Sequence, residues 1–396
     1  MLTTHYLRAE LKNILDYWYS KVFYAAEDRF YGRVDERDHP EIGAPMGSVM
    51  YARILWTCAA VYRVIPDLRY LQMAAVAYRW LNVGFNDPVN GGIYWLISAN
   101  GAPVVDKKQI YAQAFTLYSF AEYYRINPEQ QILDKAIALY ELIEQHSFDP
   151  MFGGYFEAFA RNWSAARDMR LSPKDLNYQK TMNTHLHIME AYVNLYRVWP
   201  DVQLAGKINQ LINLFGKHIV HASDKHLGLF FDEQWTPKSA TVSYGHDVEA
   251  SWLLCEAAEV LGNTGEIYDV RQLAIAMVEA AKQGFDNNGG LNYEYEPRER
   301  RLIAEKHWWV QAESVVGLLN AWQITGDHQY YAAFQKNWDY IITHVIDRQN
   351  GEWFWGIGAD GKIMPGQDKA GVWKCPYHNS RCLLQMLDRL ANRPKK

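Results

Sequence analysis

The strongest constraint on the fold is a glycine–aromatic signature that recurs along the chain. It appears as RFYGRV, GGIYW, GGYFEAF, LGLFFDE, GGLNYEYE and GEWFW, at Gly32, Gly92, Gly154, Gly228, Gly290 and Gly351. Successive copies are 60, 62, 74, 62 and 61 residues apart. Self-similarity at a nearly fixed period is typical of a repeat architecture. Asp or Asn precedes most copies and aromatic residues follow, so each copy predicts a turn and a short hairpin-like loop.

Two helical patterns lie between consecutive signatures. In the first interval, MGSVMYARILWTCAAVYRVI and LRYLQMAAVAYRWLNVGF carry apolar residues at helical spacing, and the second interval repeats this arrangement. One unit is therefore helix, turn, helix, aromatic loop. An open solenoid would need polar caps, which neither terminal unit provides. We expect an all-α fold, an (α/α)6 barrel of six helical hairpins with short aromatic–glycine loops, formed by residues 1–396 as a single domain.

The composition limits the partners that the chain can have. The formal net charge is −5 at pH 7, so neither nucleic acid nor an anionic membrane surface is an expected partner. No apolar run is long enough to span a bilayer, and the stretch MLTTHYLRAELKNILDYWYS lacks the apolar core of a signal peptide. These features predict a cytoplasmic protein without membrane contact.

Cysteines and aromatic residues add two further expectations. The four cysteines lie in no metal-binding spacing, which predicts free thiols in a reducing compartment; they are Cys58, Cys255, Cys375 and Cys382. The chain also has 15 Trp and 27 Tyr, a heavy load even for a well-packed core. Because aromatic rings stack on sugar rings as well as on each other, this load favours a carbohydrate ligand.

Each unit places a polar or large aromatic side chain near the start of its first helix. From the first unit to the sixth, these residues are Arg53; Tyr111; Asn183 and His187; His246 and Glu249; Trp308, Trp309 and Glu313; Trp373 and His378. In a ring, the six starts meet at one end of the axis and form a concave pocket, the usual form of a small-molecule site. Six helix N-termini also give that pocket a positive potential, which suits an anionic transition state.

Some of these residues also have a purely structural interpretation. His246 and Glu249 stand side by side on one helix face, and an isolated pair of this kind is usually a solvated ion pair. Their place in the repeat favours a functional role instead. His185, two residues before His187, is expected to point away from the pocket and pack, and Glu190 would orient His187 from one turn further along.

Metal and cofactor chemistry have no support in the motifs. HExxH is absent, and the stretch HLH would splay its two rings apart on a helix, so one zinc ion could not bind both. GxSxG and the phosphate-binding glycine patterns are absent as well. The sequence therefore predicts an enzyme that uses neither metal nor cofactor.

Two histidines from different sides of the ring, His246 and His378, indicate proton transfer. An unperturbed imidazole titrates near neutrality, and burial at a helix N-terminus favours its neutral, basic form. Glu249 beside His246 would steady the imidazolium once it forms. Such a pair suits removal of a proton next to a carbonyl from one face and its return from the other. Three further residues could hold the developing oxyanion, namely Arg53, Asn183 and His187.

The stretches that carry these residues resemble one known family. NTHLH, GHDVEASWLL, WWVQAE and WKCPYHN together are similar to the acylglucosamine 2-epimerase superfamily, and specifically to its cellobiose 2-epimerase branch. The resemblance covers essentially the whole chain and implies the (α/α)6 barrel that the repeats predict independently. It also implies epimerisation at C2 of the reducing-end sugar of a cellobiose- or lactose-type β-1,4 disaccharide, through ring opening, a cis-enediolate and reprotonation on the other face.

The resemblance implies a role for each matched residue. His246 and His378 would be the acid/base pair, with Glu249 supporting His246. Three residues would contact O1 and O2 of the intermediate with Tyr111 nearby; they are Arg53, Asn183 and His187.

The remaining matched residues would bind the sugars. Trp309 and Trp373 would bracket the reducing sugar, and Glu313 would bind or polarise it. Ser172 and Asp175, in LSPKDLN, would reach the second sugar of a disaccharide. A ketose would arise as a side product when the same enediolate is protonated at C1.

Several alternatives stay open at this stage. Tyr51 and Ser380 depart from the family pattern, which often has Asn or Ser and then Gly at these positions, so the subsite beyond the reducing sugar could differ. A monosaccharide-specific mannose 2-epimerase or a mannose isomerase would carry the same catalytic set. A glycoside hydrolase on the same barrel would use paired carboxylates, here Glu249 and Glu313. An inert carbohydrate-binding scaffold is the non-enzyme alternative, and the assembly is expected to be a monomer or homodimer.

Overall fold

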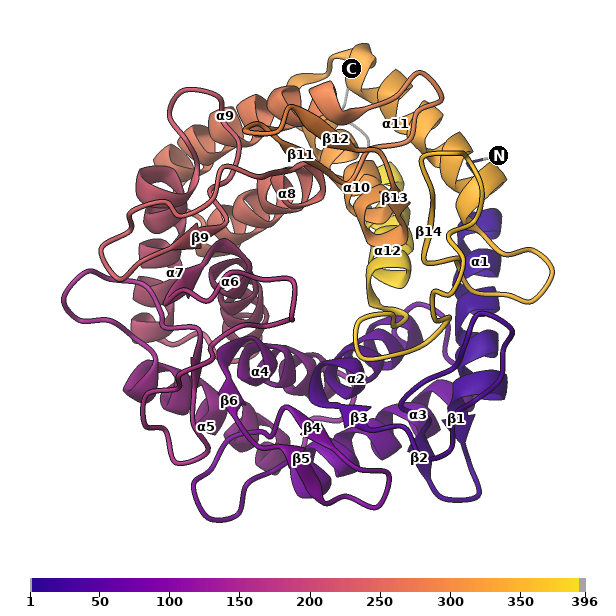
Figure 1. The fold of residues 1–396 in the computed structure, drawn as a ribbon, viewed down its shortest axis with the longest axis vertical. Coiled ribbons are helices and arrows are strands. Elements are labelled where there is room, and N and C mark those ends of the chain that lie inside the picture. The colour runs from indigo at the N-terminus through magenta and orange to yellow at the C-terminus, as the bar shows by residue number, and fades with distance from the viewer. Residues whose placement is uncertain (1, 392–396) are drawn as a thin grey trace.

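The computed structural model of the protein describes residues 2–391, which form a ring of helices around a central axis (Figure 1). The inner helices are α2 (Ser48–Tyr62), α4 (Ile110–Tyr124), α6 (Met182–Tyr196), α8 (Tyr244–Leu261), α10 (Trp308–Thr325) and α12 (Tyr377–Ala391). The outer helices are α1 (Thr4–Tyr17), α3 (Leu68–Arg79), α5 (Gln130–His146), α7 (Val202–Leu214), α9 (Thr264–Ala281) and α11 (His328–Tyr340). The predicted (α/α)6 architecture is confirmed.

The two ends of the chain close the ring. Each inner helix packs against the next one along, and α12 packs against α2 to complete the circle. Five outer helices follow their inner partners directly, but the sixth pair consists of α12 and the N-terminal helix α1. Five of the six expected hairpins are therefore continuous in sequence, and the last is assembled from the first and last helices. The glycine repeat could not show this, because α1 precedes its first copy.

Burial explains the composition of the two layers. Every residue of α2 from Ser48 to Val61 is buried, because an inner helix has neighbours on all sides. An outer helix such as α3 buries only one stripe of residues and exposes the other to solvent. Among the described helices, none is long and apolar enough to cross a bilayer.

Short strands tie each hairpin together at one end of the ring. The strands are β1 (Phe23–Tyr24), β2 (Arg29–Phe30), β3 (Met46–Gly47), β4 (Leu96–Ile97), β5 (Pro103–Val105), β6 (Lys108–Gln109), β7 (Ala158–Phe159), β8 (Lys180–Thr181), β9 (Phe230–Phe231), β10 (Val242–Ser243), β11 (Glu294–Glu296), β12 (Arg301–Ile303), β13 (Lys306–His307) and β14 (Gly356–Ile357). The strand before an inner helix pairs antiparallel with the loop that follows its outer helix, as in β3–β4, β6–β7, β8–β9, β10–β11 and β13–β14. The inner-helix starts and the aromatic loops therefore lie at the same end of the ring, as the repeat predicts.

A repeated hydrogen bond holds each aromatic loop on its inner helix. The side chain of Gln113, the fourth residue of α4, accepts from the backbone N–H of Ile93 at 2.7 Å and donates to its carbonyl at 2.8 Å. Fourth residues of four other inner helices bond the equivalent loop positions; they are Tyr51, His185, Asp247 and Gln311. Burying a loop backbone requires such partners.

This repeated bond settles two expectations about single residues. His185 accepts from the backbone N–H of Tyr155 at 2.8 Å, which confirms it as a packing histidine. The hydroxyl of Tyr51 bonds the backbone N–H of Phe30 at 2.9 Å, so this departure from the family pattern supports a loop. Its contacts give no support to the expectation that it reshapes a sugar subsite.

Candidate active site

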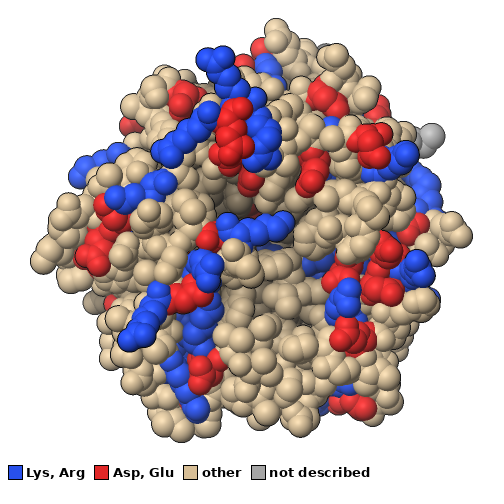
Figure 2. Space-filling model, viewed as in Figure 1, with Lys and Arg blue, Asp and Glu red and all other residues tan. Residues whose placement is uncertain are grey.

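The inner-helix starts leave a few side chains open towards the axis. In the first turns of α6, α8 and α10 the surrounding residues are buried, whereas Asn183, His246 and Trp309 keep partial exposure. Trp373 is also partly exposed, although it lies in the bend before α12 rather than in the helix where the repeat placed it. Figure 2 shows this face of the ring, hollowed near its centre and bordered by charged side chains.

The two histidines of the predicted acid/base pair contact the same indole. The ring centre of Trp309 is 4.7 Å from that of His246 and 5.8 Å from that of His378. Trp309 belongs to α10, between α8 and α12, so the indole lies where the two imidazoles converge. The structure thus gathers His246 and His378 into one cluster rather than into separate cavities.

A carboxylate fixes the orientation of His378. Its Nδ1 is 2.7 Å from Oε1 of Glu313 and 4.0 Å from Oε1 of Glu249. Because a carboxylate only accepts, Nδ1 carries the proton and Nε2 is left with its lone pair for a substrate. Burial lowers the pKa of His378 well below its usual value, and the positive charges of Arg53 and Arg381 add to this effect. The neutral, basic form is therefore the resting state.

A hydroxyl, not a carboxylate, is the partner of His246. Its Nδ1 is 2.8 Å from Oγ of Ser243, three residues earlier. The expected pairing of Glu249 with His246 is therefore wrong: Glu249 contacts Arg381 and faces His378. Helical side chains lean towards the N-terminus, which carries His246 back over Ser243. Burial and the nearby charge of His187 lower the pKa of His246 to about 3.

Arg381 lies at the centre of three buried carboxylates, although no sequence expectation included it. Its Nη2 contacts Glu249 at 2.5 Å and Glu313 at 2.7 Å, and its Nη1 contacts Glu190. Burial and the charge of Glu313 raise the pKa of Glu249 to about 7. Burial would also raise the pKa of Glu190, but Arg381 and the hydrogen bond from His187 lower it to about 2. A spacing of i and i+3 from His378 was the available signal for Arg381.

A second group of predicted residues surrounds Arg53. Its Nη2 donates to the hydroxyl of Tyr111 at 2.8 Å, and the ring of Tyr111 lies 5.0 Å from that of His187. Nδ1 of His187 is 2.8 Å from Oε2 of Glu190, which confirms the expected contact between them. Within residues 2–391, the buried Oδ1 of Asn183 and Nε of Arg53 have no hydrogen-bond partner. Because buried polar atoms are nearly always paired, both are available to a ligand.

The two tryptophans expected to bracket a sugar belong to different sides of this cluster. Trp373 packs near Tyr111, with ring centres 6.2 Å apart, and near Trp95 at 5.8 Å. Trp309 instead contacts the two histidines. The partly exposed indoles therefore lie on the Arg53 side and on the imidazole side of the open end.

Ser172 and Asp175 lie outside the cluster, in the loop between β7 and β8. The backbone N–H of Ser172 donates to Oδ2 of Asp175 at 2.7 Å, and Lys107 anchors the loop by donating to the carbonyl of Arg170 at 2.6 Å. Burial and neighbouring carboxylates, including that of Asp175, raise the pKa of Tyr293.

Tyr293 links this loop to the imidazoles. It lies edge-on to Trp309 with ring centres 6.2 Å apart, so it stands between the loop of Asp175 and the cluster. Sequence reasoning did not select it, although it belongs to the aromatic signature GGLNYEYE.

One group of side chains has the composition of a metal site. Ligand atoms of Glu249, Glu313 and His378 lie within 4.8 Å of one another. The guanidinium of Arg381 contacts both carboxylates, and so occupies the place that a cation would need. The group does not fit a metal ion in this arrangement.

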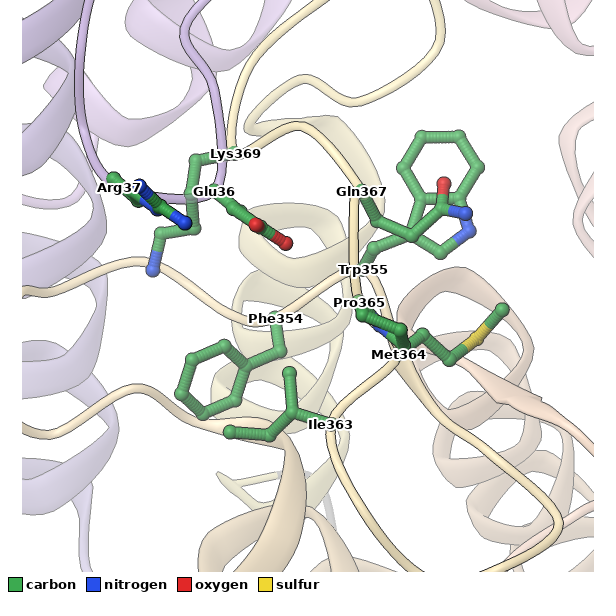
Figure 3. Close-up of a pocket in the computed structure, with 9 residues that line it drawn as sticks. All are labelled: Glu36, Arg37, Phe354, Trp355, Ile363, Met364, Pro365, Gln367 and Lys369. Atoms are coloured by element: carbon green, nitrogen blue, oxygen red, sulfur yellow. The ribbon is translucent and has the colours of Figure 1, made fainter.

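A separate cavity of about 340 Å³ lies among the loops of the same end. Figure 3 shows charged side chains beside Phe354 and Ile363; the lining residues are Glu36, Arg37, Phe354, Trp355, Ile363, Met364, Pro365, Gln367 and Lys369. None of the predicted site residues lines it. Trp355 lies next to Trp308, with ring centres 4.7 Å apart, and the ring centre of Trp308 is 6.4 Å from that of His378, so the two indoles stand between the cavity and the cluster.

Comparisons with known proteins agree with this geometry. The sequence model of N-acylglucosamine 2-epimerase matches residues 30–382. The chain is 44% identical over 374 residues to the cellobiose 2-epimerase of Bacteroides fragilis, covering 94% of this chain and 95% of that one. It is 34% identical over 355 residues to the cellobiose 2-epimerase of Dictyoglomus turgidum, covering 89% of each.

A solved structure extends the likeness to three dimensions. The structure of cellobiose 2-epimerase from Bacillus thermoamylovorans superimposes with a TM-score of 0.93 at 40% identity, covering 98% of this chain and 99% of that one. Sequence and fold therefore agree over nearly the whole ring, and the chain belongs to the N-acylglucosamine 2-epimerase family.

Proposed function

We propose that the protein is an aldose 2-epimerase that interconverts the glucose and mannose configurations at C2 of a reducing-end sugar, with cellobiose-type β-1,4 disaccharides as substrates. The observation that carries the proposal is the convergence of His246 and His378 on Trp309, each with its Nδ1 already bonded. Two imidazoles that offer Nε2 to one space are what removal and return of a C2 proton require. Relatives named cellobiose 2-epimerase support the disaccharide class.

The reaction begins when the pyranose opens to its aldehyde. One imidazole takes the C2 proton, and the electron pair moves into a C1–C2 double bond while charge develops on O1. The other imidazole, which has taken up a proton from water, delivers that proton to the opposite face of C2 and the carbonyl re-forms; the first imidazole then returns its proton to water. Reversal exchanges the two roles, so each ring needs a neutral and a protonated state.

Three groups are placed to stabilise the charge on O1 and O2. Arg53 supplies a guanidinium that cannot lose its proton, and His187 supplies an imidazole held by Glu190. Asn183 adds an amide whose Nδ2 group can donate to an enediolate oxygen, while its Oδ1, unpartnered among the described residues, can accept from a sugar hydroxyl. Fixed donors aimed at developing charge lower the barrier without reorganising during the reaction.

Sugar recognition is assigned to the rim of the site. Trp309 and Trp373 are partly exposed indoles that suit stacking on a pyranose. Ser172 and Asp175 lie beyond them, and Tyr293 links their loop to Trp309, so we assign them to the second sugar. Glu313 acts through His378 rather than on the sugar, which revises the role expected of it.

We also propose the wider setting of this activity. The reaction needs neither metal nor cofactor, and its partner is the carbohydrate itself. Four buried free cysteines favour a reducing cytoplasm. Because the first and last helices pack together, the ring acts as a single catalytic domain. We expect this domain to be present as a monomer or a homodimer.

The main alternatives use the same cluster differently. Protonation of the enediolate at C1 instead of C2 gives a ketose, so isomerisation is the natural side reaction. A glycoside hydrolase is disfavoured by the carboxylates, because Glu249 and Glu313 both contact Nη2 of Arg381. An inverting hydrolase separates its carboxyl groups by about 6.5–9.5 Å to admit a water, and a retaining one spaces them by about 5–5.5 Å with one carboxylate free to attack the sugar. Here one guanidinium engages both carboxylates, so neither is free to attack.

One assay separates these possibilities. The protein is incubated with cellobiose, lactose, glucose and mannose in separate reactions in D2O, and products are followed by NMR. We expect deuterium at C2, formation of the C2 epimer and faster turnover of the disaccharides. Release of monosaccharides from cellobiose, or an absence of C2 deuteration from all four sugars, would refute the proposal. Faster turnover of mannose alone would favour the monosaccharide-specific alternative.

A further inference from the structure

Arg381 connects four consecutive inner helices through one side chain. It belongs to α12, is 2% exposed, and uses both terminal nitrogens. Nη1 contacts Glu190 of α6, while Nη2 contacts Glu249 of α8 at 2.5 Å and Glu313 of α10 at 2.7 Å. A single guanidinium therefore holds carboxylates from three neighbouring helices.

Two of these carboxylates continue to imidazoles of the site. Glu313 meets Nδ1 of His378 at 2.7 Å, and Glu190 meets Nδ1 of His187 at 2.8 Å. His246 is outside this network, because its Nδ1 meets the hydroxyl of Ser243. The two imidazoles of the acid/base pair are therefore supported differently. His378 is held by a carboxylate that also contacts Arg381, whereas His246 is held by a neutral hydroxyl on its own helix boundary.

The three carboxylates of the cluster require the shape of a guanidinium as well as its positive charge. Three buried carboxylates repel one another unless a positive charge lies between them. A planar guanidinium offers several donors in fixed directions, whereas a lysine ammonium is a compact point charge that cannot span three helices. Rings of Trp252 and Tyr377 cover the guanidinium carbon at 4.8 and 4.5 Å, so its position is fixed by packing as well.

We propose that Arg381 is a positioning residue that fixes His378 through Glu313 and His187 through Glu190, so that proton transfer at His378 depends on Arg381 far more strongly than proton transfer at His246 does. The inference rests on the proposed epimerisation and deepens it. Arg381 acts on the reaction only indirectly, because the carboxylates that it holds are the groups that contact the imidazoles. His187 serves the enediolate formed from either epimer, whereas His378 serves one face only. Loss of Arg381 should therefore slow exchange slightly at both faces of C2 and much more at the face that His378 serves.

The test measures C2–H exchange from each epimer separately in D2O. Arg381→Lys keeps the positive charge and loses the fixed geometry. From the epimer whose C2 proton faces His246, we expect exchange to persist within about threefold of the wild-type rate, since that imidazole can return a deuteron to the same face. From the other epimer, we expect exchange to fall about 10²-fold, as for a misplaced catalytic group. Epimerisation falls with the slower step in both directions, while KM for the disaccharide stays within about twofold.

A matched control lies on the same helix. Arg389 bonds Asn320 at 2.9 Å and Gln323 at 2.8 Å at the far end of α12, away from the imidazoles. Arg389→Lys should leave exchange from both epimers unchanged. If Arg381→Lys does not fold, Glu313→Gln tests the same link without removing the cation and should show the same one-sided loss.

The outcomes separate this inference from the proposed function. Equal loss of exchange from both epimers in a folded Arg381→Lys protein, or no loss from either, would overturn the positioning role while leaving epimerisation by the wild type intact. Absence of C2 exchange in the wild-type protein would instead overturn the proposed function. Histidine tautomers observed by 15N NMR give an independent readout, with only His187 and His378 changing in the variant.

Discussion

His378 and His246 occupy unlike settings within one site. His378 is buried, with 5% of its surface exposed, and its Nδ1 contacts Glu313, with Glu249 and Arg381 behind it. His246 is partly exposed and rests on a serine hydroxyl. A carboxylate stabilises the imidazolium and fixes one tautomer, whereas a hydroxyl can donate or accept and so permits either tautomer. Two bases of a reversible reaction therefore need not be supported by the same kind of group.

Removing either imidazole should have the largest effect. We expect His378→Asn and His246→Asn each to lower epimerisation by about 10²–10⁴-fold, the usual contribution of a general acid or base. Each variant should keep C2 exchange from one epimer only, and the surviving epimer should differ between the two. NMR in D2O measures both rates. Survival of exchange from the same epimer in both variants would show that the two rings do not serve opposite faces.

Glu313→Gln probes the ionic support of His378. Without the negative charge, Nδ1 no longer meets an obligate acceptor, so the imidazolium loses stabilisation and the tautomer is no longer fixed. A loss of up to about 10⁴-fold is expected, as for removal of the carboxylate from a catalytic triad. Single-turnover kinetics with each epimer check the prediction. A loss that is the same for both epimers would argue that Glu313 supports the fold of the site and not His378.

The raised pKa of Glu249 predicts a pH dependence for one face only. Glu249, with a pKa of about 7, is protonated below that pH and ionised above it. Once ionised, it lies 4.0 Å from Nδ1 of His378 and favours the imidazolium that forms on proton abstraction. Exchange from the epimer facing His378 should rise several-fold through pH 7, and Glu249→Gln should abolish that rise. A similar rise for the epimer facing His246 would contradict the assignment.

The same shift predicts a stability effect of opposite sign. The pKa of Glu249 is raised from its ordinary value of 4.5, so the group favours the folded state most below pH 4.5 and loses this contribution as pH rises through 7. Thermal unfolding of the wild type and Glu249→Gln at pH 5 and pH 8 measures it. We expect the variant to gain stability relative to the wild type between these pH values.

Ser243→Ala probes the neutral support of His246. A neutral hydrogen bond contributes about 0.5–1.5 kcal/mol, so we expect a loss of about 2- to 10-fold, confined to the epimer facing His246. Exchange rates from both epimers check it. If Ser243→Ala lowered exchange as much as Glu313→Gln does, the hydroxyl and the carboxylate would support their imidazoles equally strongly.

Tyr51→Phe should have the smallest effect on catalysis, and it gives the exchange ratio expected of a variant that alters only the loop. The backbone N–H of Phe30 would lose its partner, which costs about 1–3 kcal/mol of unfolding free energy in a buried place. Neither imidazole is touched, so the ratio of exchange from the two epimers should stay at the wild-type value. Chemical denaturation and the exchange assay measure the two effects, and a changed ratio would show that the loop supports catalysis.

Periodicity made much of the site predictable. Arg53, His187, His246 and His378 all stand at corresponding points of apolar helices, and the ring brings them to one end of its axis. Partner choice was not predictable. Glu249 is three residues from His246 in sequence, yet it meets Arg381 from another helix. Such contacts depend on the direction of each side chain on its helix and on the packing of neighbouring helices. A sequence separation of three residues indicates neither.

Sequence alone determined the repeat, the layered helices and the residue types at each inner-helix start, because glycine turns and apolar periodicity act locally. Only the tertiary structure decided that α1 completes the last hairpin and that Arg381 gathers three carboxylates. It also decided that the two imidazoles rest on different groups. Apart from the bond between Ser243 and His246, these contacts join residues at least 65 positions apart, and their geometry exists only once the ring has closed.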